Sequence, residues 1–225
     1  MQALLIRLTG VTAHFRDPRI NTAKIGLPSR TLHCPPPATL HGLLMSAKGG
    51  WIEPQSLRVG WRLDYASISI DFQTSQLPQR KTYNWTAGYQ RTSASPVERE
   101  YLAFPVLSIL ALEGVQSNWF RRPANPLSLG RSEDLITERI WQEVEVSSTR
   151  SGEVYRQCLP LTVGSGTIYP TPMYFEGNRR PVGMAPRVDA RQKQVLQLRD
   201  DSSQLAVLPK SGETFYVWNF GDVKS

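Results

Sequence analysis

Apolar and polar side chains alternate in several stretches of the chain, which is the period of a β-strand. In residues 3–12, Leu4, Ile6 and Leu8 recur at every second position, so this stretch is predicted to be a core strand. A more apolar run at 102–112 has the composition of a buried strand. The sequence therefore predicts further strands over residues 61–72, 102–112, 136–146 and 214–220.

One segment has the spacing of an amphipathic helix. In residues 38–48 the apolar positions fall at i, i+3, i+4 and i+7, as Leu40, Leu43, Leu44 and Ala47. Prolines precede it and two glycines follow it, which are typical helix start and stop signals. A second, shorter helix is predicted over 115–122, where Pro123 ends it.

Two segments break these patterns. Residues 15–37 form a basic loop that ends in three consecutive prolines, and these cannot join a sheet. Residues 73–99 are polar and aromatic, and their length permits an extended β-hairpin that projects from the sheet. The 17 prolines and 16 glycines also favour short strands and loops over a helix bundle.

The predicted order is strand, helix, strand, strand, weak helix, strand. This is the ferredoxin-like β-α-β-β-α-β arrangement, which RNA-recognition modules also use. We therefore predict an α+β fold with an antiparallel sheet, a protruding hairpin and a β-rich C-terminal extension. The ferredoxin-like domain covers 1–140, with the hairpin at about 73–99, and 141–225 forms the extension, packed on the same domain.

Charge divides the chain into basic and acidic segments. Lys and Arg total 26 against 19 Asp and Glu, and 20 of the cations are arginine. Arginine makes bidentate contacts to phosphate and stacks on bases, so this bias favours a nucleic-acid partner, although a basic surface without a polyanion partner stays open. Cations gather in 1–52 and 177–199, whereas 133–153 is acidic. The acidic strand region at 133–145 is interpreted as a face for a basic protein neighbour.

Arginines, lysines and aromatic rings occur together in two of these segments. A basic loop beside the N-terminus of the first helix offers cations and free N–H groups to phosphates, and interleaved rings and cations in the hairpin suit stacking on single-stranded bases. The candidate RNA-binding residues are Arg16, Arg19, Lys24, Arg30, Thr39, Arg80, Lys81, Tyr83, Trp85, Arg91, Arg121, Arg122 and Arg131.

Each candidate has a structural alternative. Tyr83 and Trp85 can anchor the hairpin on the sheet, and Arg121 with Arg122 can be a solvated pair. Arg131 can hold its own loop through hydrogen bonds to backbone carbonyls, and Gly130 serves the turn.

Two blocks of sequence carry a resemblance to a known family. The first is Phe15-Arg16 after the first strand, followed by Pro-Pro-Pro-Ala-Thr-Leu-His-Gly-Leu-Leu at 35–44. The second is Arg-Glu-Tyr-Leu at 99–102, followed by Asn-Pro-Leu-Ser-Leu-Gly-Arg-Ser-Glu at 125–133. In order and spacing these resemble the Cas-five family of CRISPR-associated RAMP proteins across residues 1–140.

The resemblance implies a RAMP-type fold in which the hairpin corresponds in position to the family's thumb. It also implies a subunit of a type I Cascade-like surveillance complex that grips the repeat-derived 5′ handle of the crRNA. The partners it implies are the Cas-seven backbone subunit, the Cas-eight large subunit and, through the complex, target DNA.

Whether the protein is catalytic is predicted from its three histidines. Some members of the family cleave precursor guide RNA with a histidine, a neighbouring lysine and a tyrosine, without metal. Here the histidines are followed by Phe15, Cys34 and Gly42, so no lysine is adjacent and we expect a noncatalytic protein. The alternative is a metal-independent endoribonuclease in which a tyrosine approaches His33. No nucleotide-binding, hydrolase or zinc motif occurs, so no cofactor or metal is expected.

Compartment is predicted from the apolar runs and the cysteines. The longest mostly apolar stretch, 102–112, is interrupted by Pro105 and Ser108, so no membrane span is expected. The N-terminal run reads as a strand and not as a signal peptide. Cys34 and Cys158 are expected to be buried and reduced, and the protein is expected to be cytoplasmic.

Overall fold

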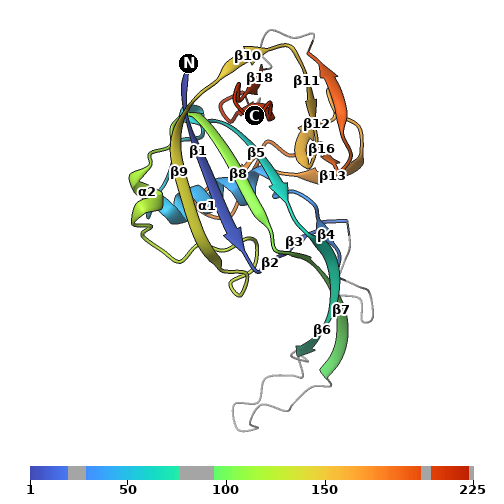
Figure 1. Cartoon of the computed structure of the whole chain (residues 1–225). Coiled ribbons are helices and arrows are strands. Elements are labelled where there is room, and N and C mark those ends of the chain that lie inside the picture. Colours follow the sequence, from blue (N-terminus) through green and yellow to red (C-terminus); the bar gives the residue numbers. More distant parts are fainter. Residues whose placement is uncertain (20–28, 77–93, 199–203, 223–225) are drawn as a thin grey trace.

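Antiparallel β-sheet makes up most of the regular structure in the computed structural model (Figure 1). The structure describes residues 1–19, 29–76, 94–198 and 204–222. The longest helix in these residues is α1 (Pro37–Lys48), and α2 (Asn118–Arg121) and the 3-10 turn η1 (Pro54–Ser56) are shorter. The predicted α+β class with an antiparallel sheet is thereby confirmed.

A seven-stranded antiparallel sheet forms the centre. In order across the sheet its strands are β10 (Ser147–Thr149), β18 (Gln204–Val207), β19 (Thr214–Asn219), β5 (Arg58–Asp64), β8 (Val106–Glu113), β1 (Gln2–Gly10) and β9 (Ile136–Glu145). β1 lies between β8 and β9, with Ile6 opposite Ile109 on one side and Trp141 on the other.

Four of these strands have a ferredoxin-like arrangement. In chain order they are β1, β5, β8 and β9, with α1 after the first and α2 after the third. Across the sheet they lie in the order β5, β8, β1, β9, and each neighbouring pair is antiparallel. β8 therefore separates β1 from β5, as in the split β-α-β motif that the sequence predicts.

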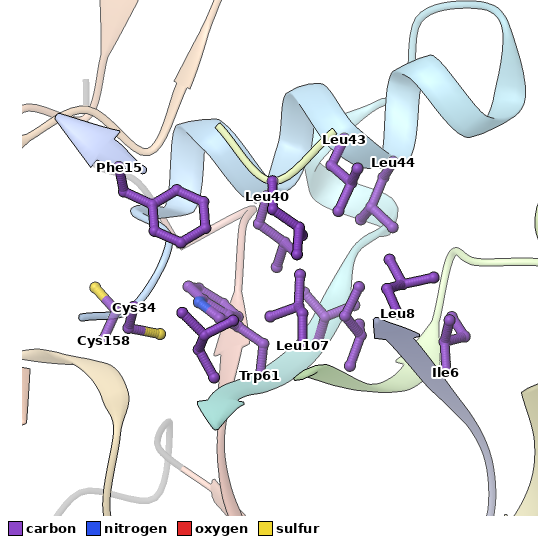
Figure 2. Packing of buried hydrophobic residues seen from close by; sticks show 14 of the residues in the cluster. Ile6, Leu8, Phe15, Cys34, Leu40, Leu43, Leu44, Trp61, Leu107 and Cys158 are labelled. Atoms are coloured by element: carbon purple, nitrogen blue, oxygen red, sulfur yellow. The ribbon is translucent and has the colours of Figure 1, made fainter. Parts of the chain in front are cut away.

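The main core lies between this sheet and α1 (Figure 2). Leu40 and Leu44 are fully buried against Ile6, Leu8 and Leu107. The helix is preceded by Pro36 and ends at Gly49, which has a left-handed backbone (φ 80°) and donates its N–H to the carbonyl of Met45 at 2.8 Å. The predicted limits of this helix are correct to within one residue.

Both cysteines belong to the same core. Cys34 and Cys158 are free and buried beside Trp61, as predicted (Figure 2). Burial raises the pKa of Cys158 to about 12, so the thiol stays protonated and acts as a small apolar side chain.

The opposite face of the sheet is covered as well. Leu5 and Leu110 pack there with Phe215 and Val217 of β19. Because both faces of β1 are buried, Leu4, Leu5 and Ile6 follow one another without a polar interruption.

A long hairpin leaves the central sheet (Figure 1). It is formed by β6 (Ser67–Gln76) and β7 (Ala94–Ala103), paired from Ser67 opposite Ala103 to Gln76 opposite Ala94. The short strand β2 (Thr12–Ala13) pairs with the base of β7. Residues 77–93, which connect the two strands in sequence, lie outside the described residues.

The hairpin corrects two strand predictions. The single strand predicted over 61–72 is wrong, because it divides at Tyr65 and Ala66 into β5 and β6. The strand predicted over 102–112 divides in the same way at Phe104 and Pro105. Phe104 has φ 50°, and Pro105 has no N–H to donate, so the ladder is interrupted here and the two strands leave the sheet together.

Short strands complete the C-terminal part and the loop after β1. The pairs are β3 (Phe15–Arg16) with β4 (Thr31–Leu32), β11 (Ser151–Val154) with β17 (Gln194–Gln197), and β14 (Tyr174–Phe175) with β15 (Pro181–Val182). A three-stranded sheet has the order β12 (Gln157–Pro160), β16 (Ala185–Ala190), β13 (Thr167–Thr171). Leu159 and Val188 of this sheet pack against Tyr216 of β19.

The second helix is shorter than predicted. α2 covers four residues instead of the eight of 115–122, and Val115 lies outside it. In the parts of the chain that the structure describes, no helix is both long and apolar enough to cross a membrane.

Candidate nucleic-acid interface

The N-terminus of α1 does not present the free N–H groups that the sequence predicts. Pro37 has no N–H, and the N–H groups of Thr39 and Leu40 both bond to the carbonyl of Pro36, at 3.0 and 3.1 Å. Three of the first four helix residues therefore have no N–H to offer a phosphate. The prediction of orphan donors at Thr39 is wrong because the proline-rich entry satisfies or removes them.

The cations of the basic loop that the structure describes are exposed, and Arg19 is also paired with Asp17. Arg19 donates through Nε to both carboxylate oxygens of Asp17, at 2.9 and 3.2 Å. Burial alone would raise the pKa of Asp17, but the hydrogen bonds from Arg19 outweigh it and lower that pKa. Arg16 and Arg30 are exposed, with Arg30 Nε 3.9 Å from a carboxylate oxygen of Glu100. Lys24 lies outside the described residues.

Three arginines from distant parts of the chain converge beside this loop. We call Arg19, Arg156 and Arg191 the arginine cluster. Arg156 stacks on Tyr65, with its guanidinium carbon 4.2 Å from the ring centroid. Arg191 Nε lies 3.4 Å from Oδ2 of Asp189, and Arg19 donates to the carbonyl of Ile168 at 3.3 Å.

A buried polar group supports the arginine cluster. His33 hydrogen-bonds through Nδ1 to the Tyr65 hydroxyl, and its backbone N–H donates to Asp189 Oδ2 at 3.1 Å. Burial, together with Arg191 and Arg156, lowers the pKa of His33 to about 4, so the ring is neutral at pH 7. Burial also raises the pKa of Asp189, although hydrogen bonds from His33 and Arg191 oppose it. Through these contacts His33 holds both Tyr65, on which Arg156 stacks, and Asp189, which pairs with Arg191.

The guanidinium heads of the cluster remain accessible. The side chains of Arg19, Arg156 and Arg191 are 43%, 29% and 45% exposed. Each guanidinium has five N–H donors, and their internal partners use only some of them. The arrangement can therefore hold phosphate oxygens in bidentate fashion at the base of the hairpin, because Tyr65 directly precedes the bend into β6.

Sequence reasoning missed Arg156 and Arg191. Arg191 lies in the basic segment 177–199, which contains six cations against Asp189 alone, so a signal for it was present. Arg156 follows the acidic segment and had no such signal. Arg156 lies in a turn where its own backbone is left-handed (φ 51°), and its N–H donates to the carbonyl of Ala190.

The Leu-Gly-Arg element contacts the hairpin stem. Gly130 has φ 113°, and a Cβ at this position would lie 2.0 Å from the carbonyl oxygen of His14. Arg131 hydrogen-bonds to Gln73 Oε1 of β6 and lies 3.6 Å from Glu133. Among the described residues, Arg131 therefore bonds to side chains of the stem and of its own loop, whereas the structural alternative expected backbone carbonyls.

A second arginine stabilises the same face of the stem. Arg99 of β7 donates to Glu133 at 3.1 Å and to Asp71 of β6 at 3.4 Å. The hairpin is thus joined to the domain by an ionic network at its base, which limits how far the stem can swing.

One face of the stem carries exposed apolar side chains. Ile68, Ile70 and Phe72 of β6 are 45%, 61% and 67% exposed, and Phe104 at the base is 65% exposed. The sequence predicted these alternating residues as part of one strand over 61–72, and in the structure they belong to the separate strand β6, with this face exposed among the described residues. Exposed rings of this kind are suited to stacking on unpaired bases.

The remaining candidates lie elsewhere or cannot be placed. Arg121 and Arg122 are exposed at the end of α2, and α2 contacts β9, at the edge of the sheet away from β5, from which the hairpin continues (Figure 1). They are not brought together with the arginine cluster. The hairpin-tip candidates lie outside the described residues: Arg80, Lys81, Tyr83, Trp85 and Arg91.

All three histidines are buried. His14 contacts the carbonyl of Glu100 through Nδ1 at 2.7 Å, and His41 contacts that of Ile52 through Nε2 at 3.0 Å. His33, 4% exposed, hydrogen-bonds to the hydroxyl of Tyr65, and the ring of Tyr174 lies 5.7 Å from that of His41. Within the residues that the structure describes, no three His, Cys, Asp or Glu side chains form a group able to hold a metal ion.

Comparison with known proteins identifies the fold. No protein-family model matches the sequence, and no curated protein matches it. The structure resembles a CRISPR protein from Archaeoglobus fulgidus, with a TM-score of 0.50 and 11% identity over 96% of this chain and 98% of the other. It also resembles a chain of the type III-B Cmr-beta complex bound to cognate target RNA and AMPPnP, with a TM-score of 0.51 and 10% identity over 88% and 86%.

A chain of a CRISPR RNA-guided surveillance complex has 18% identity over 87% of this chain and 90% of its own, with a TM-score of 0.48. The likenesses to the Archaeoglobus fulgidus protein and to the Cmr-beta chain extend over most of both chains. They show that this chain shares its fold with CRISPR-associated proteins.

Proposed function

We propose that this chain is a noncatalytic RNA-binding subunit of a type I CRISPR Cascade-like surveillance complex, similar to the Cas-five RAMP proteins. In this role it caps the repeat-derived 5′ handle of the crRNA and joins a Cas-seven backbone subunit to a Cas-eight large subunit for guided DNA targeting. The observation that carries the proposal is the arginine cluster at the base of a projecting hairpin, in a fold shared with CRISPR-associated proteins.

The chemistry of the interface suits single-stranded RNA. Guanidinium groups make bidentate contacts to phosphate and hold the backbone without reading its sequence. Phe72 is exposed further along the hairpin, where bases can stack, and the sequence predicts that Tyr83 and Trp85 add two more rings for stacking. Phosphate contacts at the base and stacking toward the tip would together orient a short RNA end along the hairpin.

The test is RNA binding measured as a function of salt. The isolated protein is titrated with labelled repeat RNA at several salt concentrations, and the variants Arg191→Gln and Arg30→Gln are compared with the control Arg58→Gln. Arg58 is 36% exposed and pairs with Glu113 at the end of β5 that pairs with β19, away from the cluster. Each lost phosphate contact should reduce the slope of log affinity against log salt by about 0.7.

Two results would contradict the proposal. One is an affinity that does not change between about 50 and 200 mM salt, since phosphate contacts release counterions. The other is equal weakening by the control variant, which would mean that net charge and not the cluster governs binding.

A metal-independent endoribonuclease is the second candidate, because Tyr65 contacts His33. A neutral histidine can act as a general base, and a pKa of about 4 keeps His33 neutral at pH 7. Against this, His33 is 4% exposed and the Tyr65 hydroxyl occupies its Nδ1. We expect repeat RNA to stay intact in EDTA. Cleavage at one position that is lost in a folded His33→Ala variant would instead establish the nuclease.

A further inference from the structure

The outer edge of β9 is an unusually open strand edge. β9 has ten residues and forms one end of the seven-stranded sheet, where it pairs with β1 alone among the strands of the described residues. The other end, β10, has three residues. Strands average about 5–6 residues, and proteins usually shorten, bend or cover their edges because exposed N–H and C=O groups invite another strand.

Apart from α2, which contacts β9, most of this strand is exposed. Seven of the ten residues of β9 are exposed, and among them Ile140 is 51% exposed. The loop before β9 hydrogen-bonds to the start of the strand, where Ile136 donates its N–H to the carbonyl of Leu127 at 2.9 Å. Beyond Ile136 the strand contains no proline, and its register with β1 stays regular from Glu138 to Glu145.

The charge of the edge is opposite to that of the chain. β9 carries Glu138, Glu143 and Glu145 against Arg139, whereas the whole chain has a net charge of +7. Within the described part of the chain, these three carboxylates have no ion pair. The other acids of the predicted acidic face are already used, since Glu133 pairs with Arg99 and Asp134 is buried.

A groove continues the surface on the C-terminal half of β9. It has a volume of about 630 Å³ and separates Gln142–Glu145 from the turn that joins β18 to β19. Its lining combines the apolar Leu5 and Leu208 with charges of both signs: Glu143 and Glu145 on β9, Lys210 in the turn, and Glu213, which pairs with Arg7. Such a groove can accept the side chains of a segment that lies along the strand.

We propose that β9 binds an extended basic segment of a neighbouring protein subunit, which pairs with this edge as an eighth strand and places Lys or Arg beside Glu143 and Glu145. The proposal rests on the proposed function only in naming the neighbour as a subunit of the same complex. RNA does not fit this surface, because phosphates would be repelled by the carboxylates and RNA cannot continue a backbone ladder.

Residue-resolved hydrogen exchange tests the strand pairing directly. Hydrogen exchange is compared between the ribonucleoprotein complex that co-purifies with this chain and the isolated chain. Added pairing should slow every second amide of 137–145 by about tenfold or more, because alternate N–H groups of an edge strand point outward. Unchanged exchange in the complex would overturn the proposal, and so would slowing by RNA alone.

Charge reversal tests the partner chemistry. The double variant Glu143→Lys and Glu145→Lys should lose at least about half of the co-purifying subunits while repeat RNA binding by the isolated chain is kept. Glu176→Lys is the control, since Glu176 is exposed and outside β9. Normal assembly of the double variant would mean that the carboxylates only guard the edge against aggregation. If the wild-type protein did not bind repeat RNA, that result would contradict the proposed function but not the proposed binding surface on β9.

Discussion

Replacement of Gly130 tests how the Leu-Gly-Arg element is held against the domain. Gly130 has φ 113°, a region that side chains with a Cβ rarely adopt, and its added Cβ would lie 2.0 Å from the carbonyl oxygen of His14 and 2.8 Å from its carbon. Both atoms are backbone, so no side-chain rotation relieves the overlap. Ordinary contact begins at 3.4 Å, and the two segments would have to separate by more than about 1 Å.

The expected cost has three parts. The backbone conformation costs about 1–3 kcal/mol for a residue other than glycine. Overpacking of two backbone segments costs about 1–3 kcal/mol. Separation also weakens the hydrogen bond from the His14 N–H to the carbonyl of Leu129, now 3.1 Å, for about 0.5–1.5 kcal/mol. Gly130→Ala should therefore lower the free energy of unfolding by about 2.5–7.5 kcal/mol, a large share of the usual 5–15.

Urea denaturation measures this change, and Gly42→Ala is the matched control. Gly42 lies in α1 with nothing within 4 Å of its added Cβ, so alanine there should stabilise the protein by about 0.5–1 kcal/mol. The two Gly→Ala changes should thus have opposite signs. A Gly130→Ala variant within about 0.5 kcal/mol of wild type would refute the close approach of this loop to His14.

Three other changes test the buried polar group, the core and the hairpin tip. The pKa of His33 is lowered to about 4 from the ordinary 6.5, so it lies below the value in the unfolded chain. The contribution of His33 to stability is therefore complete above pH 6.5 and is lost as the pH falls toward 4. Imidazole NMR should show no titration of His33 near pH 6.5. Leu44→Ala should lower the free energy of unfolding by about 2–5 kcal/mol, and a change below about 1 would mean that the site is not in a packed core. Tyr83→Ala or Trp85→Ala should weaken binding to the 5′ handle by about 1–3 kcal/mol in a fluorescence titration, while normal binding with early melting would identify the rings as structural.

The sequence by itself determined the elements whose signals are local. The spacing of Leu40, Leu43, Leu44 and Ala47 requires one apolar helix face, and the prolines before and the glycines after it set its limits. β1 and β9 follow from alternation over nine and ten residues, and β19 was predicted as a strand at the end of the chain. The order of these elements was enough to predict the ferredoxin-like arrangement, because antiparallel β-α-β-β-α-β chains have few ways to bury one sheet face under helices.

Only the tertiary structure decided what covers each face. Ile70 and Phe72 alternate as regularly as Ile6 and Leu8, yet the first two are exposed and the last two are buried. Periodicity states which residues share a face, but it says nothing about whether another element packs on that face. The bend at Phe104 and Pro105 carries β6 and β7 away from the sheet, and so leaves Ile70 and Phe72 uncovered.

The candidate site has the same limit. Arg19, Arg156 and Arg191 are separated by more than thirty residues at each step and share no motif, so their convergence depends on how β16 and the turn before β12 pack beside the basic loop. The sequence did indicate an arginine-rich protein with a basic loop and a projecting hairpin. Which of those arginines meet is a property of contacts between distant segments, for which a local pattern carries no signal.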